Sequence, residues 1–319
     1  MRKIDVIITD THFGVKNNSK KWLTRQLAGL DEIKQYILSI RNDFDEINLV
    51  HCGDVFDSRS AINTYVLKFA RDKIKELARC VDHCYILAGN HDYYSPDGTH
   101  MDINSIELLL DGENIECITK EYLKVGDTCF VPWYEFDRVD EIIELEHPKV
   151  IYTHTDLFNY TNKNNVLIIS GHIHTPVQYN RSINICSTFA LNFADVNQER
   201  GFYTLCDNYL EFHPLNEIIK FHSIYSSSES FFEPKEIREF DYLRIYITKE
   251  HRLEDRYTEV IRSYQEKCFN VEVVVYSPQN SLNESYLPSV LNIDDIIIEL
   301  IPDYLKEKFN ELKCTTLKS

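Results

Sequence analysis

Four short apolar runs in the sequence each open into glycine together with aspartate, asparagine or histidine. They are IITDTHFGV from Ile7, VHCGDVFDSR from Val50, ILAGNHDYY from Ile86 and IISGHIHTP from Ile168. Carboxylate oxygen, amide oxygen and imidazole nitrogen all bind divalent metals, and glycine lets a chain turn sharply. One such fragment would be ordinary, but four in one chain indicate a single site that several strands build together.

The candidate metal ligands come from these fragments and from the strand end YTHTD around His154. A lone Asp or His after a strand more often caps a turn than binds a metal. The inference therefore rests on the ordered set DxHxG, GDxxD, GNHD and GHxH, and His154 adds a strand end with a weaker local pattern. The candidates are Asp10, His12, Asp54, Asn90, His154, His172 and His174.

This mixture of donors suits two divalent ions, with Mn favoured and Fe or Mg as alternatives. If Asp54 bridges the two ions, they can clamp a phosphate and turn bound water into hydroxide. In open α/β sheets, ligands bind beyond the carboxyl ends of the strands, which is where every candidate falls. The sequence therefore predicts a phosphoester hydrolase.

The elements that must position these ligands alternate along the chain from Ile4 to about Leu215, in the order of a layered α/β domain. Apolar residues at helical spacing predict helices over 22–40 and 62–77, and these helices are expected to cover the sheet. The predicted strands are Ile4–Thr9, Ile47–Cys52, Cys84–Ala88, Cys129–Val131, Val150–Thr153, Val166–Ser170, Ile183–Ser187 and Phe202–Cys206.

A second, smaller unit is predicted after the Ser-rich segment SIYSSSES, residues 223–230, which reads as a linker. Two strands, Tyr242–Thr248 and Val271–Ser277, flank a predicted helix over Glu254–Gln265. The tail beyond them is apolar, which favours a partner groove or, equally, packing onto its own domain. The predicted divisions are 1–225, 238–280 and 281–319.

Composition sets limits on partners and compartment. The chain of 319 residues has 34 Lys and Arg against 51 Asp and Glu, a formal charge of −17, which argues against broad nonspecific attraction to nucleic acid. No stretch approaches the roughly 18 apolar residues of a membrane span, and Asp5 and Asp10 interrupt the N-terminal apolar run too early for a secretory signal. Nine scattered cysteines fit free thiols, so a cytoplasmic setting is expected.

The motifs resemble those of the calcineurin-like metallophosphoesterase superfamily. That resemblance implies an α/β fold, a double β-sheet sandwich flanked by helices. It also implies two metal positions that share Asp54. Carried over residue by residue, it places Asp10, His12, Asp54 and His174 on one metal, and Asp54, Asn90, His154 and His172 on the other.

The resemblance also suggests two catalytic residues outside the ligand set. His91 matches the histidine that the family uses as an acid toward the leaving oxygen, and a neighbour of a ligand is well placed for that role. Asp57 is expected to orient His91 through a carboxylate–imidazole hydrogen bond, as in phosphoprotein phosphatases. The alternative is that Asp57 caps a helix.

Longer blocks resemble the SbcD-type nuclease subunits of DNA double-strand-break repair, particularly the form encoded by large tailed phages. The blocks are GDVFDSRSAINTYVLKFARDKIKEL, VPWYE, GHIHT and RGFYTL. The resemblance implies a Mn-dependent DNA exonuclease or endonuclease within an SbcCD-type recombination and repair complex. It further implies a capping domain (238–280) that contacts DNA, and C-terminal helices (281–319) that bind the coiled coil of an SbcC-type ABC ATPase. A homodimer that pairs through surface helices is also expected, with 62–77 a candidate contact.

Local basic residues are candidates for DNA contacts in this acidic chain. Lys16, Lys20, Lys21 and Arg25 follow the first motif, and Arg59 follows the second. The alternatives are a solvated helix start for the lysines and a helix salt bridge for Arg59. The expected partners are therefore DNA, the ATPase and a second copy of the chain, with no membrane.

Two other functions compete with a nuclease. A stand-alone phosphatase or cyclic-nucleotide phosphodiesterase would use the same fold, but it has no evident need for the appended unit and the apolar tail. GDVFDSR also lacks the Asp-Arg-Gly ending of phosphoprotein phosphatases. A catalytically inert scaffold is disfavoured because it would be free to lose the ligand set.

Overall fold

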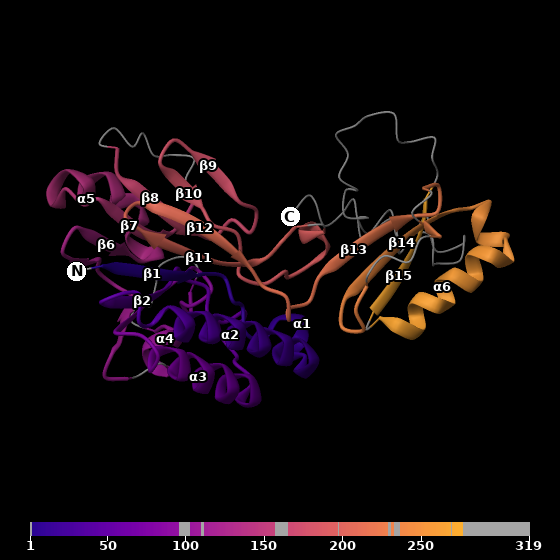
Figure 1. Cartoon of the computed structure of the whole chain (residues 1–319), viewed down its shortest axis with the longest axis horizontal. Coiled ribbons are helices and arrows are strands. Elements are labelled where there is room, and N and C mark those ends of the chain that lie inside the picture. Colours follow the sequence, from indigo (N-terminus) through magenta and orange to yellow (C-terminus); the bar gives the residue numbers. More distant parts are fainter. Residues whose placement is uncertain are drawn as a thin grey trace, which may run out of the picture.

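The computed structural model describes residues 2–95, 103–109, 112–156, 165–196, 198–228, 231–232, 237–268 and 270–276. Its strands form two six-stranded sheets and one three-stranded sheet, in two lobes (Figure 1). The two large sheets share the larger lobe, and the small sheet lies in the other.

The first sheet carries the first three motifs at one edge. Its order is β12-β11-β1-β2-β3-β4, with β1 to β4 parallel and with β11 antiparallel to both neighbours. Since β1, β2 and β3 run parallel, their carboxyl ends meet at the same edge. The strands are β1 Lys3–Ile8, β2 Glu46–His51, β3 His83–Leu87, β4 Ile115–Ile118, β11 Gly201–Cys206 and β12 Tyr209–Pro214.

The second sheet carries the remaining ligand strands. Its order is β5-β6-β7-β8-β10-β9, with β6, β7, β8 and β10 parallel. His154 ends β7, and Gly171 ends β8 just before His172. The strands are β5 Leu123–Val125, β6 Thr128–Val131, β7 Val150–His154, β8 Leu167–Gly171, β9 Val177–Tyr179 and β10 Ser182–Asn184.

The layers follow from side-chain alternation along the strands. On β1, Val6 and Ile8 pack with the helices α2 (Lys20–Ile40) and α3 (Thr64–Ala78), whereas Ile7 faces the second sheet. The outer face of the second sheet packs against α5 (Val139–Glu146) through Val139, Ile142 and Ile143. The result is a four-layer sandwich, helix–sheet–sheet–helix, and the predicted fold class is confirmed.

Helix starts and short turns complete the large lobe. Ser19 and Asn63 cap α2 and α3 by accepting hydrogen bonds from backbone amides of the first turn. The shorter helical segments are α1 Val15–Asn18, α4 Ser105–Leu109, η1 Trp133–Arg138, η3 Phe193–Asp195 and, in the small lobe, η5 His251–Leu253.

The small lobe is a parallel sheet with one helix on its face. β13 (Phe221–Tyr225), β14 (Tyr242–Thr248) and β15 (Asn270–Tyr276) pair in that order, and α6 (Asp255–Lys267) packs on Leu243, Ile245 and neighbouring residues. An apolar cluster joins the lobes, in which Trp22 of α2 contacts Phe221 and Tyr242.

Part of the segment predicted as a linker is a strand. The predicted linker spans residues 223–230, but Phe221–Tyr225 is the first strand of the small sheet. It pairs with β14, an edge that local sequence does not reveal, and the division of the chain at 225 and 238 stays a prediction. The predicted strand Ile183–Ser187 also ends early, at Asn184. The tail 281–319 lies outside the described residues.

Two further expectations concern membranes and cysteines. In the described part of the chain, no helix combines the length and apolar character needed to cross a bilayer. The cysteines among the described residues form no disulfide, and burial raises the pKa of the Cys84 thiol well above its ordinary value. Cys84 lies within the core cluster against which Cys80 packs.

Candidate metal centre

The ends of β1 and β2 remain side by side after the strands finish. The amide of Asp10 donates to the carbonyl of Gly53 at 3.0 Å, and the amide of His12 donates to the carbonyl of Asp54 at 3.1 Å. The pairing then continues from Phe13 to Val55 at 2.9 Å. These bonds place the first two motifs against each other, so that their side chains converge.

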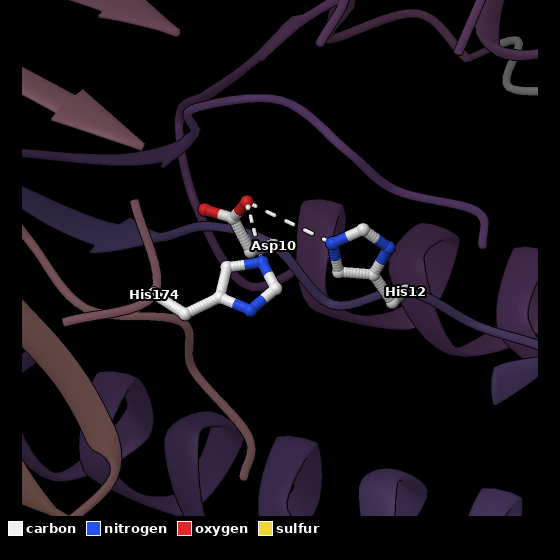
Figure 2. Close-up of side chains that lie close together, drawn as sticks. All are labelled: Asp10, His12 and His174. Atoms are coloured by element: carbon white, nitrogen blue, oxygen red, sulfur yellow. Dashed lines mark ion pairs between the residues drawn. The ribbon is translucent and has the colours of Figure 1, made fainter. Parts of the chain in front are cut away.

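A first group of donors comprises Asp10, His12 and His174 (Figure 2). One carboxylate oxygen of Asp10, Oδ1, faces both imidazoles, at 3.8 Å from His12 Nε2 and 3.6 Å from His174 Nε2. Asp10 is buried, whereas the His174 side chain is 30% exposed. The group therefore opens to solvent on the His174 side.

A second group comprises Asp54, Asn90, His154 and His172. His154 Nε2 lies 3.4 Å from Asp54 Oδ2 and 3.2 Å from Asn90 Oδ1, and His172 Nδ1 lies 3.0 Å from the same amide oxygen. His154 Nδ1 donates to the carbonyl of Cys52 at 2.6 Å, which leaves Nε2 free to bind.

Asp54 joins the two groups. Its Oδ2 lies 3.6 Å from His12 Nε2 of the first group as well as 3.4 Å from His154 Nε2 of the second. The structure thus brings together all seven predicted ligands, with the Asp54 carboxylate between the two groups.

The backbone at four of these residues lies in the left-handed region. The φ angles are 49° at Asp10, 42° at His12, 55° at Asp54 and 83° at His172. Such angles are unfavourable for residues other than glycine, by about 1–3 kcal/mol each, and they persist where the surrounding structure imposes them. These four residues follow the carboxyl ends of β1, β2 and β8, where the paired strand ends impose this backbone on side chains that converge.

The donor set fits divalent metal ions. Asp10 Oδ1 and both ring nitrogens of His12 are buried without a hydrogen-bond partner among the described residues, an arrangement that is costly unless something else binds them. Two donors that each lie about 2.0–2.2 Å from one ion are separated by roughly 3.0–3.5 Å. The observed separations of 3.0 to 3.8 Å are close to that spacing.

The electrostatics of the centre favour positive charge. Burial alone would lower the pKa of His12, but the nearby carboxylates of Asp10 and Asp57 outweigh it and raise that pKa to about 10. Burial likewise opposes protonation of His154, yet Asp54 and Asp10 raise its pKa to about 9. The carboxylates thus favour the protonated forms of His12 and His154, and bound divalent cations would replace those protons.

His91 lies beside the two groups, and its ring forms a further cluster of possible donors with His12 and Asp57. Its amide donates to Asp54 Oδ1 at 2.8 Å, and its Nδ1 lies 2.8 Å from the backbone carbonyl of Asp57. The predicted bond from the Asp57 carboxylate to His91 is absent from the described contacts. That carboxylate lies instead 3.5 Å from His12 Nδ1. Asp57 does not cap α3 either, since Asn63 does.

The predicted basic residues differ in where they lie. Lys16 lines the cavity over the site, and its ammonium lies 5.6 Å from the Trp22 ring. Lys20 lies over the Tyr65 ring, and Lys21 is exposed. Arg25 pairs with Glu217 at 3.3 Å, near the small lobe. Arg59 is half-buried, and its Nη1 has no partner among the described residues.

The cavity has a volume of about 400 Å³ and opens over the donor groups. It is lined by His12, Val15, Lys16, Asp54, Asp57, Asn90, His91, His172, His174, Leu191 and Asn192. Most of the predicted ligands therefore face one space that could hold a phosphate group.

Three residues near the ligands were not predicted. Asp92 is buried, accepts from the amides of Val55 and Gly89, and so holds the loops that carry Asp54 and Asn90. The Trp133 ring lies 4.8 Å from that of His172. Asp156 lies 3.5 Å from His172 Nε2. Asp92 and Trp133 stand inside quoted motifs, GNHD and VPWYE, but their contacts become visible only once the strands are assembled.

The chain is similar to a known protein family and to a phage protein. Residues 6–246 match the model of the calcineurin-like phosphoesterase family. Over 216 residues the chain is 26% identical to exonuclease subunit 1 of Enterobacteria phage T4, and the alignment covers 61% of this chain and 62% of that protein. The chain thus spans less than two thirds of that relative. The range matched by the family model includes every candidate ligand.

Proposed function

The chain belongs to the calcineurin-like phosphoesterase family, and from that premise we propose that it is a two-metal DNA nuclease that hydrolyses phosphodiester bonds. The observation that carries the proposal is the convergence of seven donors in two groups that share Asp54. In this proposal Asp10, His12, Asp54 and His174 hold one ion, and Asp54, Asn90, His154 and His172 hold the other. Mn is the proposed metal, because oxygen and imidazole donors are mixed in each group.

The bound ions supply a Lewis acid for the phosphate and a hydroxide at neutral pH. Around them, the residues of the chain orient the substrate and move a proton. The Nδ1–H of His91 can donate to the carbonyl of Asp57, and this bond fixes the ring and leaves Nε2 for the leaving oxygen. The bond from the His91 amide to Asp54 Oδ1 holds this acid at a set position relative to the shared ligand.

DNA is proposed as the substrate on two grounds. The T4 relative is named as an exonuclease subunit, and Phe221 of the small sheet packs against Phe193, which follows the cavity-lining Asn192 in the chain. A cavity open to solvent, with Lys16 at its side, suits a long polymer. The small lobe is proposed to contact that DNA as a capping domain, with Lys16, Lys20, Lys21 and Arg59 near its path.

Assembly is also part of the proposal. An SbcC-type ABC ATPase would supply most of the DNA affinity that a chain of charge −17 lacks, through the tail 281–319. A homodimer would form through α3, where Tyr65 and Phe69 are 41% and 38% exposed and their rings lie 4.6 Å apart. The complex would act in recombination and repair in the cytoplasm of a host cell.

The experiment is Mn-dependent cleavage of labelled single- and double-stranded DNA by the purified chain, beside an aryl phosphodiester. His91→Ala should lower the turnover of DNA by about 10²- to 10⁴-fold, the usual contribution of an acid, while two Mn ions per chain persist. His83→Ala is the matched control, because His83 is an exposed histidine at the opposite end of β3.

Each outcome separates the competing functions. Cleavage of DNA that depends on His91 supports the nuclease. If only the aryl ester is hydrolysed, and adding a coiled-coil ATPase partner does not bring DNA cleavage, the stand-alone phosphodiesterase replaces it. A chain that binds two Mn ions but hydrolyses neither substrate, with or without the partner, is a scaffold.

A further inference from the structure

A buried ion pair lies next to the candidate metal centre, and its residues belong to neither donor group. Arg200, just before β11, is 1% exposed, and Asp195, at the end of η3, is 3% exposed. Arg200 Nη2 lies 2.5 Å from Asp195 Oδ1. Burying two charges costs several kcal/mol per ion before their attraction is counted, and an apolar pair of similar size is often at least as stable. Stability alone therefore does not explain why these two charged side chains are buried, and we look for another role in their contacts.

The guanidinium of Arg200 contacts the loop that carries His174. Its Nη1 donates to the backbone carbonyl of His174, and its Nη2 donates to Gln198 Oε1 at 2.8 Å as well as to Asp195. The planar fork of arginine can serve all three acceptors at once, which an ammonium group cannot do from one position. Arg200 thus fixes the main chain at the residue whose imidazole faces Asp10.

Asp195 binds the backbone of residues 191–192, which line the cavity. Its Oδ2 accepts from the amide of Leu191 at 2.6 Å and from that of Asn192 at 3.1 Å. Leu191 and Asn192 line the cavity, as His174 does. The two charged side chains therefore connect two segments of the cavity lining, the loop that carries His174 and the segment 191–192.

We propose that Arg200 and Asp195 form a positioning pair that holds His174 at the distance from Asp10 required to bind the first metal ion. This inference rests on the proposed two-metal centre. Outer partners that orient a ligand commonly change metal affinity by about 10- to 100-fold when they are removed. Because the second donor group has no described contact with the pair, only the affinity of the first group should change.

The test uses two variants of the full chain, with Mn²⁺ binding measured by calorimetry. Arg200→Met with Asp195→Asn removes both charges, so no buried charge is left alone, and the asparagine oxygen still accepts from Leu191 and Asn192. Arg200→Lys keeps a charge beside Asp195 but cannot span the three acceptors, and it keeps the test decisive if the double variant does not fold.

The matched control is Arg238→Met with Asp241→Asn. That pair has the same chemistry, since Arg238 bonds Asp241 and donates to the carbonyls of Asn216 and Ile218, but neither residue lines the cavity. For the Arg200 variants we expect one of two Mn²⁺ affinities to fall by about 10- to 100-fold. For the control, both affinities should stay as in the wild type even where its melting temperature falls.

A second readout separates positioning from general damage. Hydrolysis of an aryl phosphodiester by the Arg200 variants should recover most of the wild-type kcat at saturating Mn²⁺, because the defect lies in metal affinity. Folded Arg200 variants with two unchanged Mn²⁺ affinities would overturn the positioning role while leaving the metal centre intact. A wild-type chain that binds no Mn²⁺ would overturn the metal centre and, with it, the role of the pair.

Discussion

At the scale of single residues, the candidate metal centre places the buried carboxylates of Asp10 and Asp54 among histidines, and these carboxylates favour nearby positive charge. Burial works against charge on every member, yet the pKa of Asp54 falls to about 2, because His154 and His12 outweigh burial. The same attraction, seen from the histidines, raises the pKa of His12 to about 10 and that of His154 to about 9. Protons and divalent ions therefore compete for the same donors.

This competition predicts the pH dependence of metal binding. Since both pKa values lie above 7, the two histidines are protonated at neutral pH, and Mn²⁺ must displace those protons. Metal affinity should therefore rise as pH increases from 6 to 8, with protons released on binding. Titration of the chain with Mn²⁺ in a weakly buffered dye solution measures that release.

His91→Ala provides the control for proton release, because His91 lies outside both donor groups and this variant should release as many protons as the wild type. Binding without proton release, or an affinity that falls with rising pH, would contradict the assignment of His12 and His154 as ligands.

Asp57 gives a second prediction at this scale. The sequence suggested that its carboxylate pairs with His91, but the carboxylate lies 3.5 Å from His12 Nδ1, and the backbone carbonyl holds His91. Asp57→Asn should therefore weaken Mn²⁺ binding, by about 10-fold if it acts as an outer partner of His12. The kcat at saturating Mn²⁺ should change little.

Calorimetry and steady-state kinetics on the same preparation of Asp57→Asn give both quantities. A large loss of kcat with unchanged Mn²⁺ affinity would instead restore the Asp57–His91 pair, and would imply that the carboxylate turns toward His91 when substrate binds.

At the scale of elements, the strand ends approach so closely that glycine is required at the end of β8. A Cβ on Gly171 would lie 2.1 Å from Thr9 Oγ1 and 2.8 Å from Asp10 Oδ2. Thr9 Oγ1 itself donates to Asp10 Oδ2 at 2.6 Å. The absence of a side chain at Gly171 thus allows the two sheets to bring Asp10 and His172 together.

Gly171→Ala should therefore lower both stability and metal binding. Overpacking of this kind costs about 1–3 kcal/mol of unfolding free energy, and the displaced Asp10 should weaken Mn²⁺ affinity. Gly126→Ala is the control, since no atom lies within 4 Å of its added Cβ, although its φ of 58° carries some strain. Urea unfolding and calorimetry on both variants test this. Unchanged Mn²⁺ affinity in a folded Gly171→Ala chain would show that the sheets can separate without cost to the site.

The sequence pattern predicted the strands that form continuous apolar runs. It missed a strand that forms only by pairing with a neighbouring strand. The strands β1, β2, β3, β7 and β8 lay within one or two residues of their predicted bounds, because buried strands read as apolar runs. Residues 223–225 of β13 were predicted to lie in a linker, because Ser223 and the serines after it suggest a turn. This segment becomes a strand only because β14 offers an edge.

The convergence of the candidate ligands was predictable for a related reason. Each of them lies at the carboxyl end of a strand or in the loop just after it, so chain order indicated where they would meet. Arg200 and Asp195 were not predictable in the same way. Their contacts with His174 and Leu191 cross from one loop to another, and no local pattern encodes such a distance.

At the scale of the whole molecule, the two lobes are joined by an apolar cluster and by one polar network (Figure 1). Asp241, which immediately precedes β14, is 1% exposed and accepts from the amide of Lys220 at 3.0 Å and from His222 Nε2 at 3.0 Å. It also pairs with Arg238, which reaches the carbonyls of Asn216 and Ile218. The carboxylate therefore connects the small sheet to the segment that leaves the large lobe.

This network predicts how the union of the lobes responds to acid. Burial would raise the pKa of Asp241, but hydrogen bonds from His222 and Arg238 outweigh it and lower the pKa to about 2, below the ordinary 3.8. A carboxylate whose pKa is lowered by folding stabilises the folded state above its unfolded pKa. That contribution is lost as pH falls through the folded value. The stabilisation by Asp241 should thus be complete at pH 6 and vanish between about pH 4 and 2.

Asp241→Asn tests this effect, because asparagine removes the charge and keeps one of the two acceptor oxygens. Wild type and variant should differ at pH 6 by about 1.5–3 kcal/mol of unfolding free energy, the usual range for hydrogen bonds to a charged group. The difference should shrink as pH falls toward 2. Melting temperatures measured by circular dichroism across this range follow the difference directly. A gap that stays constant with pH would mean that the carboxylate acts only as a hydrogen-bond acceptor, and that the lobes are held together by the apolar cluster around Trp22 and Phe221.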